Sequence, residues 1–334
     1  MATPVAVLGA GSFGTCLAML CARRHDVLLW ARDPEVAKAI NETRHNPNYL
    51  QDVELPASVR ATASLEEALD RRELVVISVP SHGVRSVMLE ARSHLDPSAL
   101  LVLTSKGIEV DTGLTMDRVL REVLDPIFHP RIVLLSGPSF AREIAEQRPT
   151  AVTVASYDET YAISVQSEIS CPWFRCYSHD DVIGVEIGGA VKNIIAIAVG
   201  MCDGLGLGLN ARAALMTRGL REMTRLGERL GANPLTFQGL SGMGDLLLTC
   251  TGDLSRNRRV GLALGGGRSL EEITSGMNQV AEGVRTTEAV CRLADQLEVD
   301  MPIAQAVRLV LEGSASARDA GGLLMSRQLR AELD

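Results

Sequence analysis

Hydrophobic residues in the first half of the chain form short uninterrupted runs, separated by stretches with helical periodicity. Runs of about four to eight apolar residues without polar alternation are typical of strands buried on both faces of a parallel sheet. The runs lie at residues 5–8, 27–30, 74–79, 100–104, 132–135, 151–154 and 173–177. Helical patterns at 15–24, 35–41 and 65–72 fall between them, the last with Ser64 as a candidate N-cap. This alternation predicts a doubly wound, mostly parallel α/β sheet.

The second half of the chain has a purely helical pattern. No convincing strand follows Gly188, and apolar residues recur at helical spacing over 189–202, 211–231, 256–264, 286–297 and 302–312. A chain of 334 residues is too long for one ordinary core. We therefore expect two domains, with the sheet in residues 1–187 and an all-helical domain in residues 188–334.

The first strand runs into a glycine-rich turn that reads Gly9-Ala10-Gly11-Ser12-Phe13-Gly14. A helix and a second strand follow within about thirty residues. In this context the first glycine permits a tight turn, the second lets a pyrophosphate approach the backbone, and the third packs helix against strand. The free N–H groups at the start of the helix then face the phosphates. The pattern predicts a Rossmann fold that binds a dinucleotide.

The end of the second strand bears on the choice between NAD and NADP. Asp33 lies nineteen residues after Gly14, near the place where an acid would bind the ribose 2'-hydroxyl. Asp33 followed by Pro34 also matches an N-cap and the first position of a helix, and we favour this interpretation. Arg32 is then available for a 2'-phosphate, which predicts a preference for NADPH with NADH as the alternative.

Polar residues follow the later strands, at the edge where open α/β sheets bind ligands. His82 follows one strand, and a structural or solvated histidine is an equal alternative to a ligand contact. Lys106 follows the next strand, where it can reach a phosphate or a carbonyl oxygen unless it is a plain surface lysine. The strand at 132–135 leads into Ser136-Gly137-Pro138-Ser139-Phe140.

The apolar side chains of residues 186–200 fall on all sides of a helix and are interrupted by Lys192 and Asn193, which indicates a helix buried all round. An isolated ammonium in such a place is costly, so Lys192 needs a partner, a shifted pKa or a ligand. The alternative is a lysine on the wet rim of a core helix. Gly188 and Gly189 suit close backbone approach. Because the domain boundary falls just before it, we expect Lys192 to face the cleft between the domains.

Two loops in the second half supply further polar groups. The segment 239–249 places Asp245 among glycines, and Thr249 lies one helical turn later on the same face. An N-cap is the alternative role for Asp245. The succession Ser255-Arg256-Asn257 at a predicted helix start forms a candidate small-anion site, unless it is a basic solvated turn.

Composition narrows the classes of partner. The net charge of −8 and the aromatic content of 3% argue against a nucleic-acid-binding surface. Seven scattered cysteines without a CxxC spacing indicate neither a zinc site nor a disulfide framework, so we expect no metal and reduced thiols in the cytoplasm. A strand at Val5 leaves no room for a signal peptide, and the longest apolar run, 190–202, is too short to span a bilayer.

Together these motifs resemble the bacterial NAD(P)-dependent glycerol-3-phosphate dehydrogenase family. The resemblance covers essentially the whole chain and rests on GAGSFG at 9–14, SKGIE at 105–109, GPSFA at 137–141, AVKNIIAIA at 190–198, GLSGMGDLLLTC at 239–250 and SRNRRVG at 255–261. It implies that the protein interconverts dihydroxyacetone phosphate and sn-glycerol 3-phosphate with NAD(P)H, and supplies glycerol 3-phosphate for phospholipid synthesis. It also leaves room for a homodimer.

The resemblance further implies roles for particular residues. Lys192 would be the catalytic proton donor and acceptor, with Asp245 and Thr249 in its network. The substrate would be contacted by Lys106, Gly137, Ser139, Lys192, Asp245, Ser255, Arg256 and Asn257. The dinucleotide would be contacted, besides the three glycines, by Ser12, Phe13, Arg32, Lys106, Ala141, Arg256, Val280 and Glu282. The family carries arginine or histidine at position 32, so the resemblance leaves the ratio of NADPH to NADH use open.

Two other functions share part of this pattern. A dehydrogenase of the same two-domain plan that acts on a 3-hydroxy acid would need a carboxylate clamp and typically a histidine base, and Lys192 with Ser255-Arg256-Asn257 argues against it. A dinucleotide sensor without activity would have no need for Lys192 and Asp245. Oxidation of NADPH in the presence of dihydroxyacetone phosphate distinguishes both from the favoured function.

Overall fold

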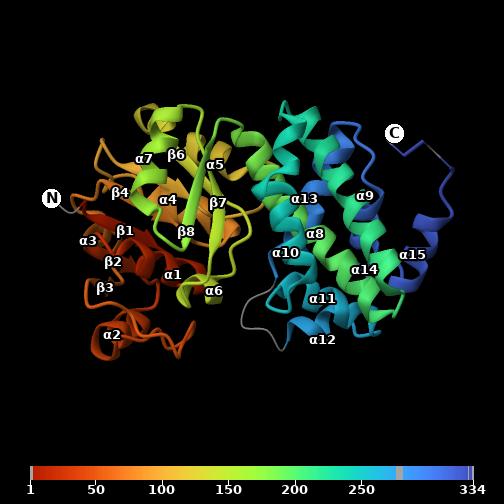
Figure 1. Cartoon of the computed structure of the whole chain (residues 1–334), viewed down its shortest axis with the longest axis horizontal. Helices are drawn as coiled ribbons and strands as arrows, with labels where there is room; N and C mark the ends of the chain where they lie inside the picture. Colours follow the sequence, from red (N-terminus) through yellow and green to blue (C-terminus); the bar gives the residue numbers. More distant parts are fainter. Residues whose placement is uncertain (1–2, 276–280, 330, 333–334) are drawn as a thin grey trace. The chain divides into compact units, whose positions relative to one another are not determined.

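The computed structural model describes residues 3–275, 281–329 and 331–332. It divides into two compact units, which are considered one at a time. The first comprises residues 1–109 and 114–186, and the second comprises residues 110–113 and 187–334. Figure 1 shows the strands of the first unit and the helices of the second.

The first unit contains one eight-stranded sheet. Its strands are β1 (Val5–Leu8), β2 (Val27–Trp30), β3 (Val59–Thr62), β4 (Leu74–Ile77), β5 (Leu100–Leu103), β6 (Ile132–Ser136), β7 (Thr150–Ala155) and β8 (Phe174–His179). They are arranged in the order β3-β2-β1-β4-β5-β6-β7-β8. All neighbours pair in parallel except β6 and β7. The predicted doubly wound, mostly parallel sheet is confirmed.

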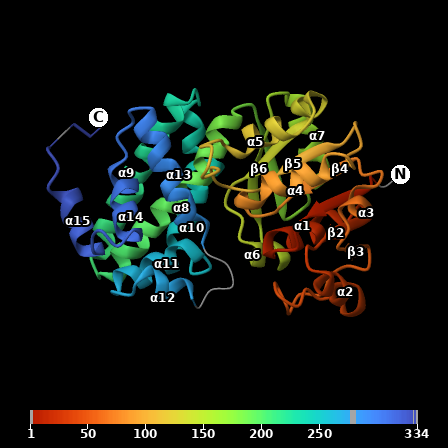
Figure 2. The same ribbon diagram turned by 180° about the vertical axis from the view of Figure 1, so that it is seen from behind.

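Both faces of the sheet are buried because successive strand residues point to opposite sides. Val5 and Val7 of β1 belong to one apolar cluster, and Ala6 and Leu8 belong to the other. The first cluster includes residues of α1 (Ser12–Cys21), α2 (Pro34–Thr43) and α7 (Glu159–Ile169). The second includes residues of α3 (Leu65–Leu69), α4 (Val84–Ala91) and α5 (Met116–Val123). Figure 2 shows the unit from behind; α6 (Ala141–Ala145) packs on α1.

The sequence pattern misplaced or missed several features of this unit, and it assigned no helix at α4, α5, α6 or α7. It missed β3, which is an edge strand only four residues long and is interrupted by the exposed Arg60. It also began the first helix at Thr15, whereas α1 starts at Ser12, inside the glycine-rich turn. The expected cap of α3 is present, since the Ser64 hydroxyl accepts a hydrogen bond from the Glu67 amide.

The second unit is helical, and no strand occurs among its described residues. Its helices are the larger part of α8 (Val182–Gly204), followed by α9 (Gly208–Arg229), α10 (Asp245–Thr251), α11 (Arg256–Gly265), α12 (Leu270–Thr274), α13 (Glu282–Gln296), α14 (Pro302–Leu311) and α15 (Ala317–Met325). Shorter helical turns lie at Pro234–Gln238 and Leu240–Gly244. The expected all-helical second part is confirmed, with α10, α12 and α15 in addition to the predicted helical ranges.

Helix α8 corrects one expectation from the sequence. It extends seven residues further toward the amino terminus than the predicted helix at 189–202, and its 23 residues are long and apolar enough to cross a bilayer. It is the one such helix among the described residues. However, 94% of its most apolar window is buried inside the fold, as is typical of a central core helix. Its apolar character therefore serves packing.

Candidate active site

The glycine-rich turn after β1 has the geometry that a dinucleotide requires. Gly9 has φ +112°, and a Cβ there would lie 2.8 Å from the Ser78 carbonyl oxygen. A Cβ on Gly14 would lie 1.9 Å from the Gly9 carbonyl oxygen, so this position must be glycine for α1 to leave the strand closely. A Cβ on Gly11, in contrast, would meet no atom within 4 Å. Open space at the middle glycine suits a pyrophosphate that approaches the backbone.

The start of α1 is also suited to an anion. Gly11 is its N-cap residue, and no side chain caps the first amides. Ser12 and Phe13 occupy the first turn and are partly buried. Amides at a helix amino terminus without an internal cap favour a phosphate. The residues present therefore fit a dinucleotide.

The structure confirms the preferred interpretation of Asp33 as a helix cap. The Asp33 side chain accepts a hydrogen bond of 3.0 Å from the Glu35 amide, and Pro34 occupies the first position of α2. Asp33 is therefore the N-cap of α2. Arg32 is exposed at the end of β2, and no described residue forms a hydrogen bond or ion pair with its side chain.

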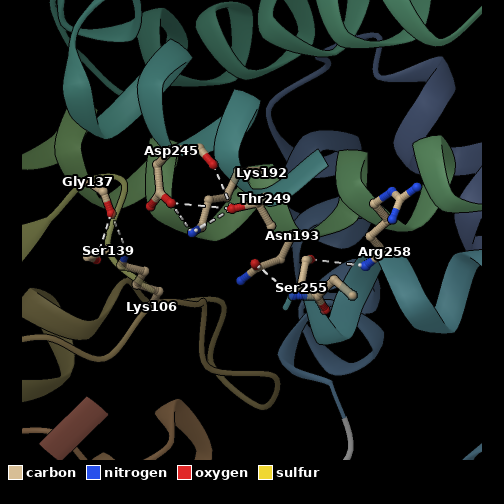
Figure 3. Close-up of polar contacts among 10 residues, drawn as sticks. Lys106, Gly137, Ser139, Lys192, Asn193, Asp245, Thr249, Ser255 and Arg258 are labelled. Carbon is tan, nitrogen blue, oxygen red and sulfur yellow. Dashed lines mark hydrogen bonds and ion pairs between the residues drawn. The ribbon is translucent and has the colours of Figure 1, made fainter. Parts of the chain in front are cut away.

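A second group of predicted residues meets at the carbonyl of Gly137. The Lys106 ammonium donates to this oxygen at 3.3 Å, and the Ser139 hydroxyl donates to it at 2.9 Å (Figure 3). Lys106 follows β5 and Gly137 follows β6, so adjacent parallel strands bring them together. Gly137 has φ +134°, and a Cβ there would lie 3.0 Å from Val152 Cα, which explains the glycine. Ala141, also predicted to contact the dinucleotide, is the first residue of α6.

Lys192 lies inside the second unit and is paired. Its ammonium is 2.5 Å from Asp245 Oδ1 and 3.1 Å from Thr249 Oγ1 (Figure 3). The three residues are only 7%, 1% and 5% exposed, respectively. The alternative of a lysine on a wet rim is therefore wrong. Asp245 is not an N-cap either, because it is the first helical residue of α10 and Gly244 precedes it as the N-cap.

The backbone around Asp245 explains how the carboxylate reaches α8. A π-helical turn at Leu240–Gly244 precedes it. A Cβ on Gly188 would lie 2.5 Å from the Ser241 carbonyl oxygen, and one on Gly242 would lie 2.2 Å from the Phe237 carbonyl oxygen. Gly188 thus permits the turn to pack directly against α8, and Gly242 permits the turn to fold closely over Phe237. Thr249, one turn after Asp245, donates to the Asp245 carbonyl oxygen at 2.6 Å, which confirms the predicted common face.

Ser255, Arg256 and Asn257 form the start of α11. The Ser255 hydroxyl caps the helix by accepting from the Arg258 amide at 3.2 Å. Arg256 is exposed in the first helical position. Asn257 is buried, and its side chain donates to Asn193 Oδ1 at 2.9 Å and accepts from the Gly283 amide at 2.9 Å. The predicted anion site therefore has a helix amino terminus and an exposed guanidinium. The Asn257 side-chain amide is held in place by its bonds to Asn193 and Gly283.

Asn193 was not among the predicted site residues, although it was recognised as a polar interruption of the helix. Through Asn257 it joins α8 to α11 and to Gly283 in the first turn of α13. A Cβ on Gly283 would lie 2.7 Å from Asn257 Oδ1 and 2.8 Å from the Asn193 carbonyl oxygen. Glu282, a predicted dinucleotide contact, is the residue before it, and Val280 lies outside the described residues.

Four glycines that the sequence interpretation passed over hold α11 against α8. Gly200 and Gly204 on α8 face Gly261 and Gly265 on α11. A Cβ on Gly261 would lie 2.0 Å from the Ile197 carbonyl oxygen, and one on Gly204 would lie 3.0 Å from Gly265 Cα. The signal was present as two glycine pairs, each spaced by four residues, which place small residues on one helix face. This close contact fixes the Ser255-Arg256-Asn257 turn relative to Lys192.

The fold and these residues define a nicotinamide-dependent oxidoreductase with a Rossmann unit and a helical unit. Sequence profiles described as "NAD-dependent glycerol-3-phosphate dehydrogenase N-terminus" and "C-terminus" match residues 4–162 and 181–321. The chain belongs to this family.

Individual relatives cover the whole length. The chain is 53% identical to the glycerol-3-phosphate dehydrogenase [NAD(P)+] of Geobacter metallireducens over 99% of each chain. It is 50% identical to that of Myxococcus xanthus over 98% of each. A crystal structure of glycerol-3-phosphate dehydrogenase from Coxiella burnetii, 37% identical, superimposes with a TM-score of 0.93 and covers 98% of this chain and 99% of that one. The resemblance inferred from the motifs is confirmed.

Proposed function

We propose that the chain reduces dihydroxyacetone phosphate to sn-glycerol 3-phosphate, and catalyses the reverse reaction, with Lys192 as the proton donor and acceptor. The enzyme uses NADH or NADPH and supplies glycerol 3-phosphate for phospholipid synthesis, the usual role of its family. The observation that carries the proposal is the buried ion pair of Lys192 and Asp245 on a helix that is otherwise apolar.

Bound nicotinamide supplies the hydride. The carbonyl oxygen gains negative charge as the hydride arrives, and the Lys192 ammonium donates a proton to it. In the oxidative direction the neutral amine takes the proton of the alcohol. Asp245 and Thr249 hold the Lys192 side chain in one conformation, because both accept hydrogen bonds from its Nζ. A fixed donor loses little freedom on reaching the transition state, which lowers the barrier.

The substrate phosphate is assigned to the start of α11. Arg256 offers a guanidinium that matches phosphate oxygens, and the helix amino terminus offers amides. Ser255 and Asn257 flank the guanidinium, and Lys106, Gly137 and Ser139 provide a second polar set for the rest of the substrate. A phosphate grip remote from the carbonyl orients the reacting atoms and contributes to turnover.

The dinucleotide is assigned to the glycine-rich turn, with Arg32 at its adenosine end. Because Asp33 is engaged as a helix cap, Arg32 is the residue that can pair with a 2'-phosphate. A preference for NADPH over NADH is part of this proposal.

The decisive assay follows the absorbance of NADPH or NADH when purified protein meets dihydroxyacetone phosphate. We expect oxidation of both cofactors, faster with NADPH at limiting concentration. Unphosphorylated dihydroxyacetone and a 3-keto acid are the control substrates. Turnover of the keto acid alone, or binding of dinucleotide without any turnover, contradicts the proposal.

A cytoplasmic location and a homodimer are the remaining parts of the proposal. Exposed apolar side chains on and after α15, namely Leu323, Met325 and Leu329, support self-association. Light scattering coupled to size-exclusion chromatography measures the mass in solution, and a monomer at micromolar concentration contradicts the dimer.

A further inference from the structure

Glu186 lies where the chain leaves the first unit. The chain passes from that unit to residues 110–113 of the second, returns at Leu114, and leaves again after Glu186. Glu186 is joined, inside the first unit, to the residues that directly follow Leu114. Glu186 Oε1 accepts a hydrogen bond of 2.8 Å from the Asp117 amide, and the Thr115 side chain and the Met116 amide also bond to its carboxyl group.

These contacts make Glu186 the cap of a helix that has none of its own. Thr115 is the N-cap residue of α5, but its side chain makes no capping bond to the helix. The Glu186 carboxyl group takes the amides of the first turn instead, which satisfies donors that would otherwise be left without partners. Val182, one turn before Glu186 on α8, and Val185, directly before it, are 1% and 0% exposed and belong to the same apolar cluster as Met116.

Helix α8 carries both this anchor and Lys192. It is continuous from Val182 to Gly204, so Lys192 is six residues, or about 9 Å along the axis, from Glu186. A small rotation of the first turns about the helix axis moves the Lys192 side chain with them. Misplacement of a catalytic group by about 1 Å can cost about a hundredfold in rate.

We propose that Glu186 is a positioning residue for Lys192, which acts by capping α5 and thereby fixing the start of α8. This inference rests on the proposed role of Lys192 in the reaction. It adds a residue that lies outside the predicted substrate and dinucleotide contacts.

The surroundings of Glu186 give the proposal a signature in pH. Asp117 is 1% exposed, and the charged and titratable groups around the pair are Arg121, Arg118 and Tyr157. Arg121 donates to Asp117 Oδ2 at 2.8 Å, whereas Asp117 Oδ1 has no partner among the described residues. Burial and the Asp117 charge raise the pKa of Glu186 to about 8. Ionisation above that pH places two carboxylates together, and their repulsion works against the fixed start of α8, although the amides themselves favour the charged form.

The second unit contains a matched control. Glu222 on α9 caps α14 in the same way, since it accepts from the Ile303 and Ala304 amides at 2.7 and 3.2 Å. Burial raises the pKa of Glu222 to about 7. It is a buried glutamate with the same chemistry, but it lies on a helix that does not carry Lys192.

The experiment compares Glu186→Ala, Glu186→Gln, Glu222→Ala and Glu222→Gln with the wild type in kcat, KM and NADPH affinity. We expect Glu186→Ala to lower kcat about 10–100-fold with NADPH affinity nearly unchanged. Glu186→Gln keeps an oxygen for the amides and should retain kcat within about threefold near pH 7. Between about pH 7 and pH 9 the ratio of its kcat to that of the wild type should rise at least about threefold, because the amide does not ionise.

The two Glu222 variants should change the free energy of unfolding or its dependence on pH. They should leave kcat within about twofold of the wild type. The proposal is overturned if Glu186→Ala keeps kcat, if Glu222→Ala loses as much, or if the kcat ratio for Glu186→Gln is flat with pH. If Glu186→Ala fails to fold, the test rests on the two glutamine variants alone, through the ratio of each variant's kcat to that of the wild type as pH changes. Turnover by the wild type tests the proposed function separately. If the wild type is active and the Glu186 variants leave kcat unchanged, only this inference is overturned.

Discussion

The Lys192 ammonium is 2.5 Å from Asp245 Oδ1, and both side chains are almost fully withdrawn from water. A buried pair of this kind contributes little net stability compared with an apolar pair, but removal of one partner costs about 3–5 kcal/mol. Loss of the lysine therefore affects both folding and chemistry, and a test of its role must separate the two.

Lys192→Met should lower kcat about 10²–10⁴-fold, the usual contribution of a general acid, with dinucleotide affinity near normal. Methionine keeps most of the packing volume, but it leaves the Asp245 carboxylate without the ammonium, so stability also falls. Adding Asp245→Asn removes that charge. The double variant should regain melting temperature and remain inactive. If instead it recovered turnover, Lys192 would be structural and Lys106 would be the next candidate donor.

Arg256→Ala should raise the KM for dihydroxyacetone phosphate and lower kcat, because a phosphate grip is used for orientation. The control is Arg259→Ala, which removes another exposed arginine of α11. The measurement is the preference for dihydroxyacetone phosphate over dihydroxyacetone in kcat/KM. An unchanged preference in Arg256→Ala, or an equal loss in the control, would show that Arg256 does not contact the phosphate.

Arg32→Ala should weaken NADPH binding by about 1.5–3 kcal/mol and NADH binding much less, since a charge-assisted contact to the 2'-phosphate is lost. Lys38→Ala removes an exposed cation of the neighbouring helix α2 and serves as the control. Titration of both dinucleotides by protein fluorescence gives the two affinities. Equal losses for both would contradict the assignment of Arg32.

Gly261→Ala should destabilise the protein by at least about 1–3 kcal/mol, because its Cβ would lie 2.0 Å from the Ile197 carbonyl oxygen and α11 must move off α8. Gly322→Ala on α15 is the control, since a Cβ there meets nothing within 4 Å. The control should be neutral or slightly stabilising. Urea unfolding measures both, and equal effects would show that the glycine contact is not tight. We also expect the KM for the substrate to rise in Gly261→Ala.

Glu222→Gln should change how stability depends on pH. The pKa of Glu222 is raised to about 7, above its ordinary value of 4.5, so the folded state favours the protonated form. Its contribution to stability is present below about pH 4.5 and is lost as pH rises through about 7. The glutamine variant cannot ionise, so its melting temperature relative to the wild type should rise between about pH 5 and pH 8. A constant difference across this range would contradict the shifted pKa.

Local patterns in the sequence determined most of the strands, the long helices of the second unit and the dinucleotide turn. Uninterrupted apolar runs specify strands buried on both faces, and the spacing of Gly9, Gly11 and Gly14 specifies a turn that few other folds need. Asp33 with Pro34 was recognised as a helix start because a cap depends on neighbouring residues only. The hydrophobic pattern did not predict β3, because an edge strand with Arg60 exposed needs no continuous apolar run.

The pairings that build the site were decided by the tertiary structure. Lys192 and Asp245 are separated by 53 residues, and Asn193 and Asn257 by 64, so no local periodicity relates them. The sequence showed that a lysine in an apolar helix needs a partner, and family motifs named Asp245, but the distance depends on Gly188 lying against the Ser241 carbonyl. In the sequence alone, Glu186 is one more polar residue at the start of a core helix. Only the fold places it on the amides of α5, because a cap supplied from another helix depends on packing between segments that lie far apart in the chain.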